Sequence, residues 1–220
     1  MKIKGDKRVI ILIFSVAIII FILCFTRGIA LWFNGISYIA NNTKQYSDEE
    51  GHTIGNEYQI SINLYDLESN IGKELYNDGE SKIYVSWIDN TGSSNSGGYR
   101  IGFRSCGIYS LNGATLVSGV CHENVDNNSF RTYMSAKMTA KYKDNISNSS
   151  VLGTSGLNYK DGDEFAFYIF PSEAYDKEDV SLDEDGIVKL SIKNLYKLWL
   201  NARLPISYVK VDLPGLWISA

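Results

Sequence analysis

Residues 130–142, FRTYMSAKMTAKY, contain the longest regular alternation of side chains in the chain. Successive residues of a β-strand point to opposite faces of its sheet, so this stretch predicts a strand with one buried face. The buried face would carry every second residue, namely Phe130, Thr132, Met134, Ala136, Met138, Ala140 and Tyr142.

Shorter stretches on both sides show the same period of two. Residues 58–64 alternate cleanly, and residues 75–76 with 82–88 predict a hairpin around a Gly-containing turn. Ile83, Val85 and Trp87 would share one face of its second strand. Further strands are expected at residues 99–111, 116–121, 165–170 and 206–213. The pattern predicts a mainly β domain, an antiparallel β-sandwich or barrel of about seven to nine strands.

Near the C-terminus the apolar spacing changes to three and four residues. Residues with this spacing lie on one face of a helix, so we expect one C-terminal helix against the sheets. They are Ile192, Leu195, Leu198, Trp199 and Ala202.

The N-terminus combines a basic flank with an uncharged apolar run. Residues 1–8 carry a net charge of +3, and residues 9–25 contain no charged side chain. This order predicts an N-terminal transmembrane helix with its start in the cytoplasm and the rest of the chain outside. We expect a cytoplasmic flank at 1–8, an anchor at 9–33, a stalk or linker at 34–50 and an extracytoplasmic β-rich domain at 51–220.

Trp32 and Phe33 are expected at the outer membrane interface, where aromatic side chains often anchor a span. Two other interpretations of the N-terminal segment stay open. A cleaved signal peptide would release a secreted protein, although Arg27 weakens the small-residue site at 28–30. Alternatively, the run is the buried helix of a soluble protein. The residues after Arg27 carry a net charge of −8, which disfavours binding to nucleic acid.

Two cysteines outside the apolar run are candidates for a disulfide. If residues 112–115 form the loop of a hairpin, Cys106 lies directly opposite Cys121. The same register places Tyr99, Ile101 and Phe103 in the core, and the two cysteines with Arg100 and Arg104 on the other face. An oxidising compartment would favour the bridge, and two reduced thiols are the alternative.

No motif for catalysis, metal or cofactor binding stands out. Cys121 and His122 are adjacent on an expected strand, so their side chains point apart and do not form a dyad. The acidic stretch from Ser181 to Gly186 resembles a calcium loop, but Ile192 occupies the twelfth place, where a bidentate Glu is needed. The four Asn-x-Ser/Thr sequons, at 41–43, 127–129, 145–147 and 148–150, are close to chance expectation.

These observations favour a membrane-anchored binding or assembly module that recognises a protein or glycan at the cell envelope. The loops at 89–98, 122–129 and 143–150 would supply contacts. An aromatic platform for sugars is a further option, formed by Tyr84, Trp87, Tyr99 and Tyr133. One alternative is an envelope hydrolase that uses scattered carboxylates.

The other alternative is a pilin-like assembly subunit, because a basic start, an apolar helix and a β-rich head resemble that class. Residues 6–8 separate Gly5 from the apolar run, and no Glu lies inside the run, which departs from the pilin pattern.

Overall fold

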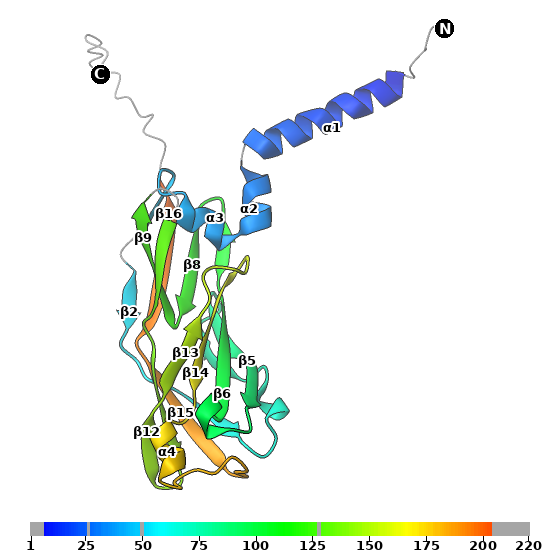
Figure 1. Ribbon diagram of the computed structural model, residues 1–220. Helices are drawn as coiled ribbons and strands as arrows, with labels where there is room; N and C mark the ends of the chain where they lie inside the picture. Colours follow the sequence, from blue (N-terminus) through cyan, green and yellow to red (C-terminus); the bar gives the residue numbers. More distant parts are fainter. Residues whose placement is uncertain (1–6, 26, 49–50, 127–128, 204–220) are drawn as a thin grey trace, which may run out of the picture.

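The computed structural model describes residues 7–25, 27–48, 51–126 and 129–203. These residues are mainly β, and their antiparallel sheets form a rod with a long helix projecting from one end (Figure 1). Over the described residues the sheets do not close into a barrel. The helical segments are α1 Lys7–Phe25, α2 Gly28–Asn34, α3 Ile36–Asn41, α4 Ser172–Asp176 and the 3-10 turns Glu68–Asn70 and Ser94–Ser96.

Two sheets enclose the larger core, in the half of the rod far from α1. The first has the order β13-β14-β6-β5-β4 and the second the order β12-β11-β15-β3. Between them lie Val85 and Phe103 from one sheet and Met138 and Leu190 from the other, all at most 2% exposed. The strands are β3 Tyr58–Asn63, β4 Glu74–Asn77, β5 Lys82–Asn90, β6 Tyr99–Cys106, β11 Lys137–Tyr142, β12 Asn145–Asn148, β13 Ser150–Thr154, β14 Gly162–Tyr168 and β15 Ile187–Lys193.

A second, smaller core lies in the half of the rod near α1. The strands of this half are β1 Tyr46–Asp48, β2 His52–Ile54, β7 Ile108–Ser110, β8 Gly113–Ser118, β9 Val120–Asp126, β10 Ser129–Met134 and β16 Leu195–Ala202. Ile36 and Ile39 of α3 and Tyr46 of β1 are buried in this core. Part of the segment expected as a stalk is therefore packed against the sheet.

Three strand breaks meet where the two halves of the rod join. Gly119 separates β8 from β9, residues 135–136 separate β10 from β11, and Asn194 separates β15 from β16. The amides of Ser135 and Ala136 both donate to the Gly119 carbonyl at 2.9 Å, and Ser135 Oγ donates to the Asn194 carbonyl at 2.9 Å. A side chain at Gly119 would collide with the Phe165 ring, so glycine is required at this junction.

The predicted C-terminal helix is wrong, because its residues belong to β15 and β16. Asn194 adopts a positive φ of 60°, which interrupts the alternation. Ile192 before the interruption and Leu195 after it are both buried, three residues apart. The alternation of buried residues in β16 is therefore out of phase with that in β15, and the two together produce the spacing expected of a helix.

The predicted alternation is confirmed over residues 136–142, where every second side chain is buried in β11. The hairpin is also confirmed as β4 and β5. The described residues form sixteen strands, more than expected, because long strands are divided at the junction and short edge strands add to them. The strand expected at 206–213 lies outside the described residues.

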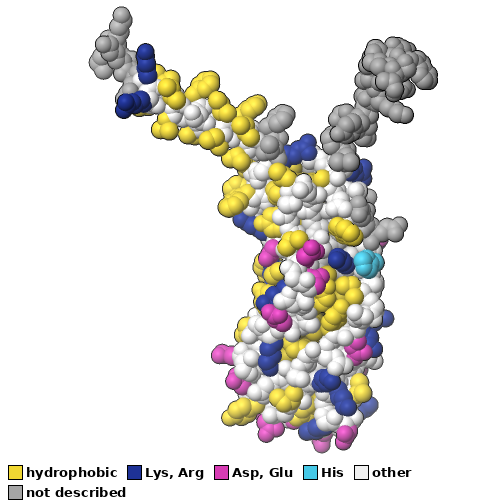
Figure 2. Space-filling view, turned by 180° about the vertical axis from the view of Figure 1, so that it is seen from behind, with side chains coloured by type: hydrophobic (Ala, Val, Ile, Leu, Met, Phe, Trp, Pro, Cys, Tyr) yellow, Lys and Arg dark blue, Asp and Glu magenta, His cyan; other side chains and the backbone are white. Residues whose placement is uncertain are grey.

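The apolar side chains of α1 pack against little else in the protein. Those from Val9 to Leu23 that are large and apolar are 45–69% exposed, and Figure 2 shows them along the projecting helix with basic side chains at its start. Among the described helices none alone has both the length and the hydropathy of a membrane span. Residues 7–23 and α2 reach the length and hydropathy of a span only when they are taken together, and the two helices are bent by 67° relative to each other. Trp32 and Phe33 are 73% and 67% exposed on α2, and their place at an interface stays a prediction.

Candidate functional site

The candidate site lies on the outer face of the first sheet, the face of β5, β6, β14 and β13 turned away from the core. Strand pairing aligns its side chains in three rows that cross the strands. The first row is Tyr84, Arg104 and Glu164. The second row is Trp87, Gly102, Ala166 and Gly153. The third row is Asp89, Arg100 and Tyr168.

The second row forms a trough, because three of its four residues have little or no side chain. Gly102 and Ala166 are directly opposite on β6 and β14, and Ala166 is opposite Gly153 on β13. Larger polar and aromatic side chains border the trough on both sides. The first and third rows are four residues apart along β6, so the trough is about 13 Å wide between their backbones.

Trp87 reaches the outer face through a β-bulge. The register between β5 and β6 shifts between Val85 and Trp87, so Ser86 is an extra residue. The prediction that Trp87 shares a face with Ile83 and Val85 is therefore wrong. Ile83 and Val85 are fully buried in the core, whereas Trp87 is half-buried on the opposite face.

Gly102 allows the Trp87 indole to lie close against the sheet. A Cβ built on Gly102 would stand 2.1 Å from Trp87 Nε1 and 2.3 Å from its Cε2 atom. No side chain larger than hydrogen fits between the ring and β6. The ring therefore rests on bare backbone and forms part of the trough surface.

The Glu164 carboxylate is fixed by three donors at the edge of the trough. Oε1 accepts hydrogen bonds from Trp87 Nε1 at 2.5 Å and Ser86 Oγ at 3.1 Å, and Oε2 accepts one from Tyr159 Oη at 2.8 Å. A carboxylate offers about four acceptor positions, so Oε2 retains one for a ligand. Trp87 and Glu164 thus form a rigid pair.

Arg104 lies beside Glu164 in the first row, is nearly buried, and is held by several partners. Its guanidinium donates to Asp161 Oδ1 and, at 2.9 Å, to the Asp163 carbonyl. It also lies 3.8 Å from the centre of the Tyr159 ring, a cation–π contact. These contacts order Tyr159, which in turn donates to Glu164.

The reactive groups at this site are not activated as nucleophiles. The hydrogen bond to Glu164, together with burial, raises the pKa of the Tyr159 hydroxyl. Burial, followed by the nearby Asp161 carboxylate, raises the pKa of the Cys106 thiol despite Arg104. Nucleophilic catalysis by either group would need the opposite shift.

Two surface hollows are candidate ligand sites. One, of about 270 Å³, is lined by Trp87, Leu152, Gly153, Thr154, Ser155, Glu164, Phe165 and Ala166, at the β13 end of the trough. The larger one, of about 480 Å³, surrounds α3 near the start of the rod and is lined by Asn34, Ser37, Tyr38, Asn41, Asn42, Thr43 and Lys44.

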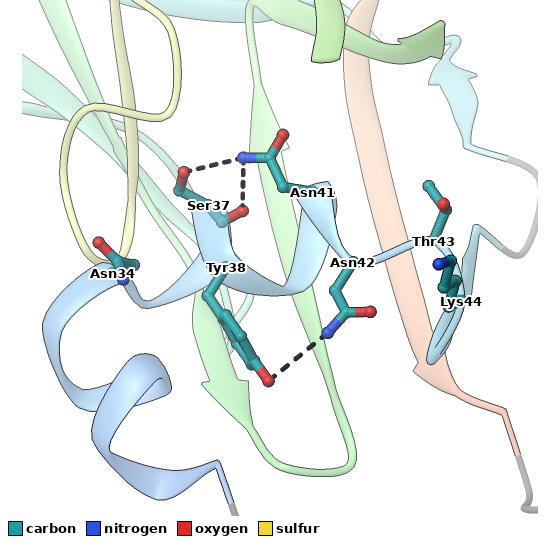
Figure 3. Close-up of a pocket in the computed structure, with 7 residues that line it drawn as sticks. All are labelled: Asn34, Ser37, Tyr38, Asn41, Asn42, Thr43 and Lys44. Atoms are coloured by element: carbon teal, nitrogen blue, oxygen red, sulfur yellow. Dashed lines mark hydrogen bonds between the residues drawn. The ribbon is translucent and has the colours of Figure 1, made fainter. Parts of the chain in front are cut away.

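The polar groups of the larger hollow mostly satisfy one another. Asn41 Nδ2 donates to the Ser37 carbonyl at 2.9 Å on one side of α3, and Asn42 Nδ2 lies 3.5 Å from Tyr38 Oη on the other side (Figure 3). These side chains diverge around the helix and do not converge on a common point. The trough is therefore the stronger candidate.

The structure shows no bridge between Cys106 and Cys121, and the register expected to place them opposite each other does not form. Cys106 on β6 is opposite Gly162 of β14, and Cys121 on β9 is opposite Tyr133 of β10. A hairpin does form between β7 and β8, but its turn lies at residues 111–112 and its pairing runs only from Ser110 and Gly113 to Ile108 and Thr115. Cys106 follows the inward-facing Ser105 and points outward. Cys121 precedes His122, which faces the core side, so the two thiols lie on opposite faces.

We predict that all three cysteines of the chain titrate as free thiols in denaturant without reductant. The separation of Cys106 from Cys121 is the physical reason, because a disulfide requires close Cβ atoms. The measurement is thiol labelling followed by intact mass. A gain of two labelled thiols on adding reductant would contradict the arrangement of β6 and β9.

Only part of the expected aromatic platform assembles. Tyr84 and Trp87 share the outer face, but Tyr99 is 2% exposed in the core and donates its hydroxyl to the Leu182 carbonyl at 2.8 Å. Tyr133 lies on β10, in a different sheet. The expected loop at 89–98 includes the end of β5 and a 3-10 turn, and much of 143–150 belongs to β12. The loop expected at 122–129 largely belongs to the β9–β10 ribbon, and its residues 127–128 lie outside the described residues.

A buried polar network lies beneath the site. Asp163 accepts a hydrogen bond from Ser118 Oγ at 2.7 Å through Oδ1, and its Oδ2 lies 2.6 Å from His122 Nε2. His122 Nδ1 is 3.2 Å from Thr132 Oγ1. The side chains of His122 and Asp163 are 2% and 0% exposed. The network joins β8, β9 and β10 to β14, and the Asp163 carbonyl supports Arg104 from below.

The acidic stretch that resembles a calcium loop is held by hydrogen bonds to other side chains and backbone groups of the chain. The Glu184 carboxylate accepts hydrogen bonds from Tyr142 Oη at 2.5 Å and from the Ser181 amide at 2.9 Å. Among the described residues no group of three or more His, Cys, Asp or Glu side chains is placed to hold a metal ion. Burial raises the pKa of Glu184, but its hydrogen bonds outweigh this and hold the pKa below the ordinary value.

We predict that Glu184→Gln destabilises the protein by about 1–3 kcal/mol at pH 7, because it weakens hydrogen bonds to a charged acceptor. A depressed carboxyl pKa contributes stability above its unfolded value and loses it as the pH falls. The difference from wild type should therefore shrink below about pH 4.5. Denaturant unfolding between pH 7 and pH 3 measures it, and a difference that grows on acidification contradicts the assignment.

Several site residues were missed by sequence analysis. Arg104 was expected on the outer face, but its partners Asp161 and Tyr159 come from a segment about 57 residues later, and nothing local connects them. Glu164 carried no signal beyond its charge.

The chain matches no known family model, curated protein or solved structure.

Proposed function

We propose that this chain is a membrane-tethered β-sandwich module, outside the cytoplasm, that recognises a protein or glycan at the cell envelope. The observation that carries the proposal is the preorganised trough, with Trp87 and Glu164 held rigidly at its surface. Groups that are already fixed lose little entropy on binding, so such a face is suited to recognition.

The tether is supported by the N-terminal helix. Its large apolar side chains are exposed to an extent that water would not favour, and lysine and arginine precede them. Insertion into a bilayer removes this apolar surface from water. The rod would then extend from the membrane, with the trough in the half far from α1.

Recognition is favoured over the alternative of an envelope hydrolase. A glycosidase needs one carboxyl group available as an acid and another as a nucleophile or base. At the trough, Asp161 is paired with Arg104, and Glu164 accepts three hydrogen bonds. The raised pKa of Tyr159 also argues against a tyrosine nucleophile.

The test uses the full chain reconstituted in liposomes. These are mixed with isolated cell envelope, either untreated or stripped of its proteins. We expect the liposomes to cosediment with envelope material, and Trp87→Ala to reduce this retention at least about tenfold, as for a central binding residue. Trp199→Ala is the matched control, since Trp199 is 45% exposed on β16, which belongs to a different sheet from the trough. Equal retention of both variants would refute recognition through this face.

An assembly subunit of pilin-like type is a second candidate, favoured by the exposure of α1 all around its circumference. Such a helix packs against copies of itself as readily as against lipid. Processing before the apolar run would shorten the chain at its N-terminus. Intact mass of the membrane-extracted protein decides this, since an unprocessed N-terminus excludes that route.

A further inference from the structure

We infer that the ligand of the trough is a neutral saccharide chain that lies across the strands and stacks a sugar ring on Trp87. This inference rests on the proposed function and specifies its ligand class. It follows from the shape of the trough, the chemistry of its surface and its charge balance.

The shape favours a chain of rings over an extended peptide. The trough runs across β5, β6, β14 and β13, and of these four strands only β13 lies at an edge of the sheet. A peptide lying across the strands would gain no ladder hydrogen bonds, which are the main source of affinity when a strand adds to a sheet. A flexible chain of sugar rings needs only a flat floor, which the Trp87 ring lying on Gly102 and the small side chain of Ala166 provide.

The surface chemistry matches a molecule with apolar ring faces and hydroxyl edges. The Trp87 indole gives a flat apolar surface held against β6, and Glu164 Oε2 has an acceptor position left for a hydroxyl donor. Thr154 and Ser155 also line the hollow beside them, where Ser155 Oγ donates to the Gly156 carbonyl and accepts from the Glu164 amide. Its volume of about 270 Å³ lies just below the usual range for enclosed ligands, as expected for a ring on an open face.

The charge balance favours a neutral ligand. Arg100 forms a two-point contact with Asp89, through hydrogen bonds of 2.8 and 2.5 Å, and Arg104 is paired with Asp161. Both cations that border the trough are thus compensated, which leaves no uncompensated cation among these bordering residues for an anionic polymer. Glu164 adds one negative charge that would repel uronic acids or phosphate.

The experiment is a titration of the full chain, in a detergent without a sugar headgroup, with four probes. Two are neutral β-1,4-linked hexasaccharides, of glucose and of N-acetylglucosamine. The others are polygalacturonate and an extended decapeptide with alternating apolar residues. We expect binding of at least one neutral hexasaccharide, seen by calorimetry and by a change in tryptophan fluorescence.

Two pairs of variants assign the binding to the trough. Trp87→Ala should weaken it at least about tenfold and Trp199→Ala should not change it. Gly102→Ala, which displaces the indole, should have the same effect, while Gly55→Ala, whose Cβ meets nothing within 4 Å, should have none. Because Gly102→Ala leaves Trp87 in the chain, it also serves if Trp87→Ala fails to fold.

Binding of neither neutral hexasaccharide, or binding that survives both trough variants, overturns the inference. If polygalacturonate or the peptide binds and Trp87→Ala removes that binding, the saccharide inference fails while recognition through the face stands. If envelope retention is also insensitive to Trp87→Ala, the proposed function itself fails.

Discussion

Asp163→Ala is expected to destabilise the protein by about 3–5 kcal/mol, because it leaves buried polar partners without their acceptor. Ser118 Oγ and His122 Nε2 both lie within 2.7 Å of the Asp163 carboxylate, which is fully buried. In a chain of this size the loss corresponds to a melting temperature lower by roughly 6–20 °C. Denaturant unfolding of the full chain in micelles measures it.

The control for this prediction is Asp89→Ala. Asp89 also forms an ion pair, with Arg100, but the two side chains are 43% and 31% exposed, so the change should cost less than about 1 kcal/mol. A double variant adds a second check. His122→Ala combined with Asp163→Ala should cost clearly less than the sum of the single changes. Additive costs, or equal costs for Asp163 and Asp89, would contradict a coupled network at the junction.

Val16→Asp combined with Ile19→Asp is expected to release the protein from membranes. Both residues lie near the middle of α1 and are 48% and 57% exposed. Each acidic residue at the centre of a membrane helix costs about 2.5–3.5 kcal/mol, so the pair removes about 5–7 kcal/mol of insertion free energy. Alkaline extraction of expressing cells measures the fraction that stays in the membrane pellet.

The matched control places the same charges on the rod. Ile146→Asp with Ile187→Asp changes two side chains that are 70% and 58% exposed on β12 and β15, and the protein should stay in the pellet. Extraction of the unmodified chain into the supernatant would contradict the tether. A mature N-terminus beyond residue 30 would instead show that the segment is a cleaved signal.

The strand pattern of the larger core could be predicted because it depends on local alternation. Ala136, Met138 and Ala140 are buried as their spacing indicates, and the same holds for Tyr99, Ile101 and Phe103. The strand partners could not be predicted in this way. β6 pairs with β5, which precedes it directly, and with β14, which lies more than fifty residues further along the chain. Local alternation carries no information about a partner so distant in sequence.

The candidate site could not be predicted from the sequence because it depends on two β-bulges and one glycine. The extra residue Ser86 moves Trp87 from the core face to the outer face, and a second shift between Val151 and Gly153 aligns Gly153 with Ala166. Neither bulge has a signal in the surrounding sequence. Gly102 was not singled out in the sequence, although an isolated glycine in a strand often marks a close approach.

Hydroxyl-radical footprinting of the liposome-bound full chain, free and bound to envelope, tests the central claim most directly. We predict that oxidation of Trp87 and Tyr159 falls on binding, because the ligand covers the trough. Tyr65, which is 80% exposed, and Trp199 should react equally in both states. Unchanged reactivity at Trp87 together with protection at Trp199 would contradict the account and move the recognition surface to the other half of the rod.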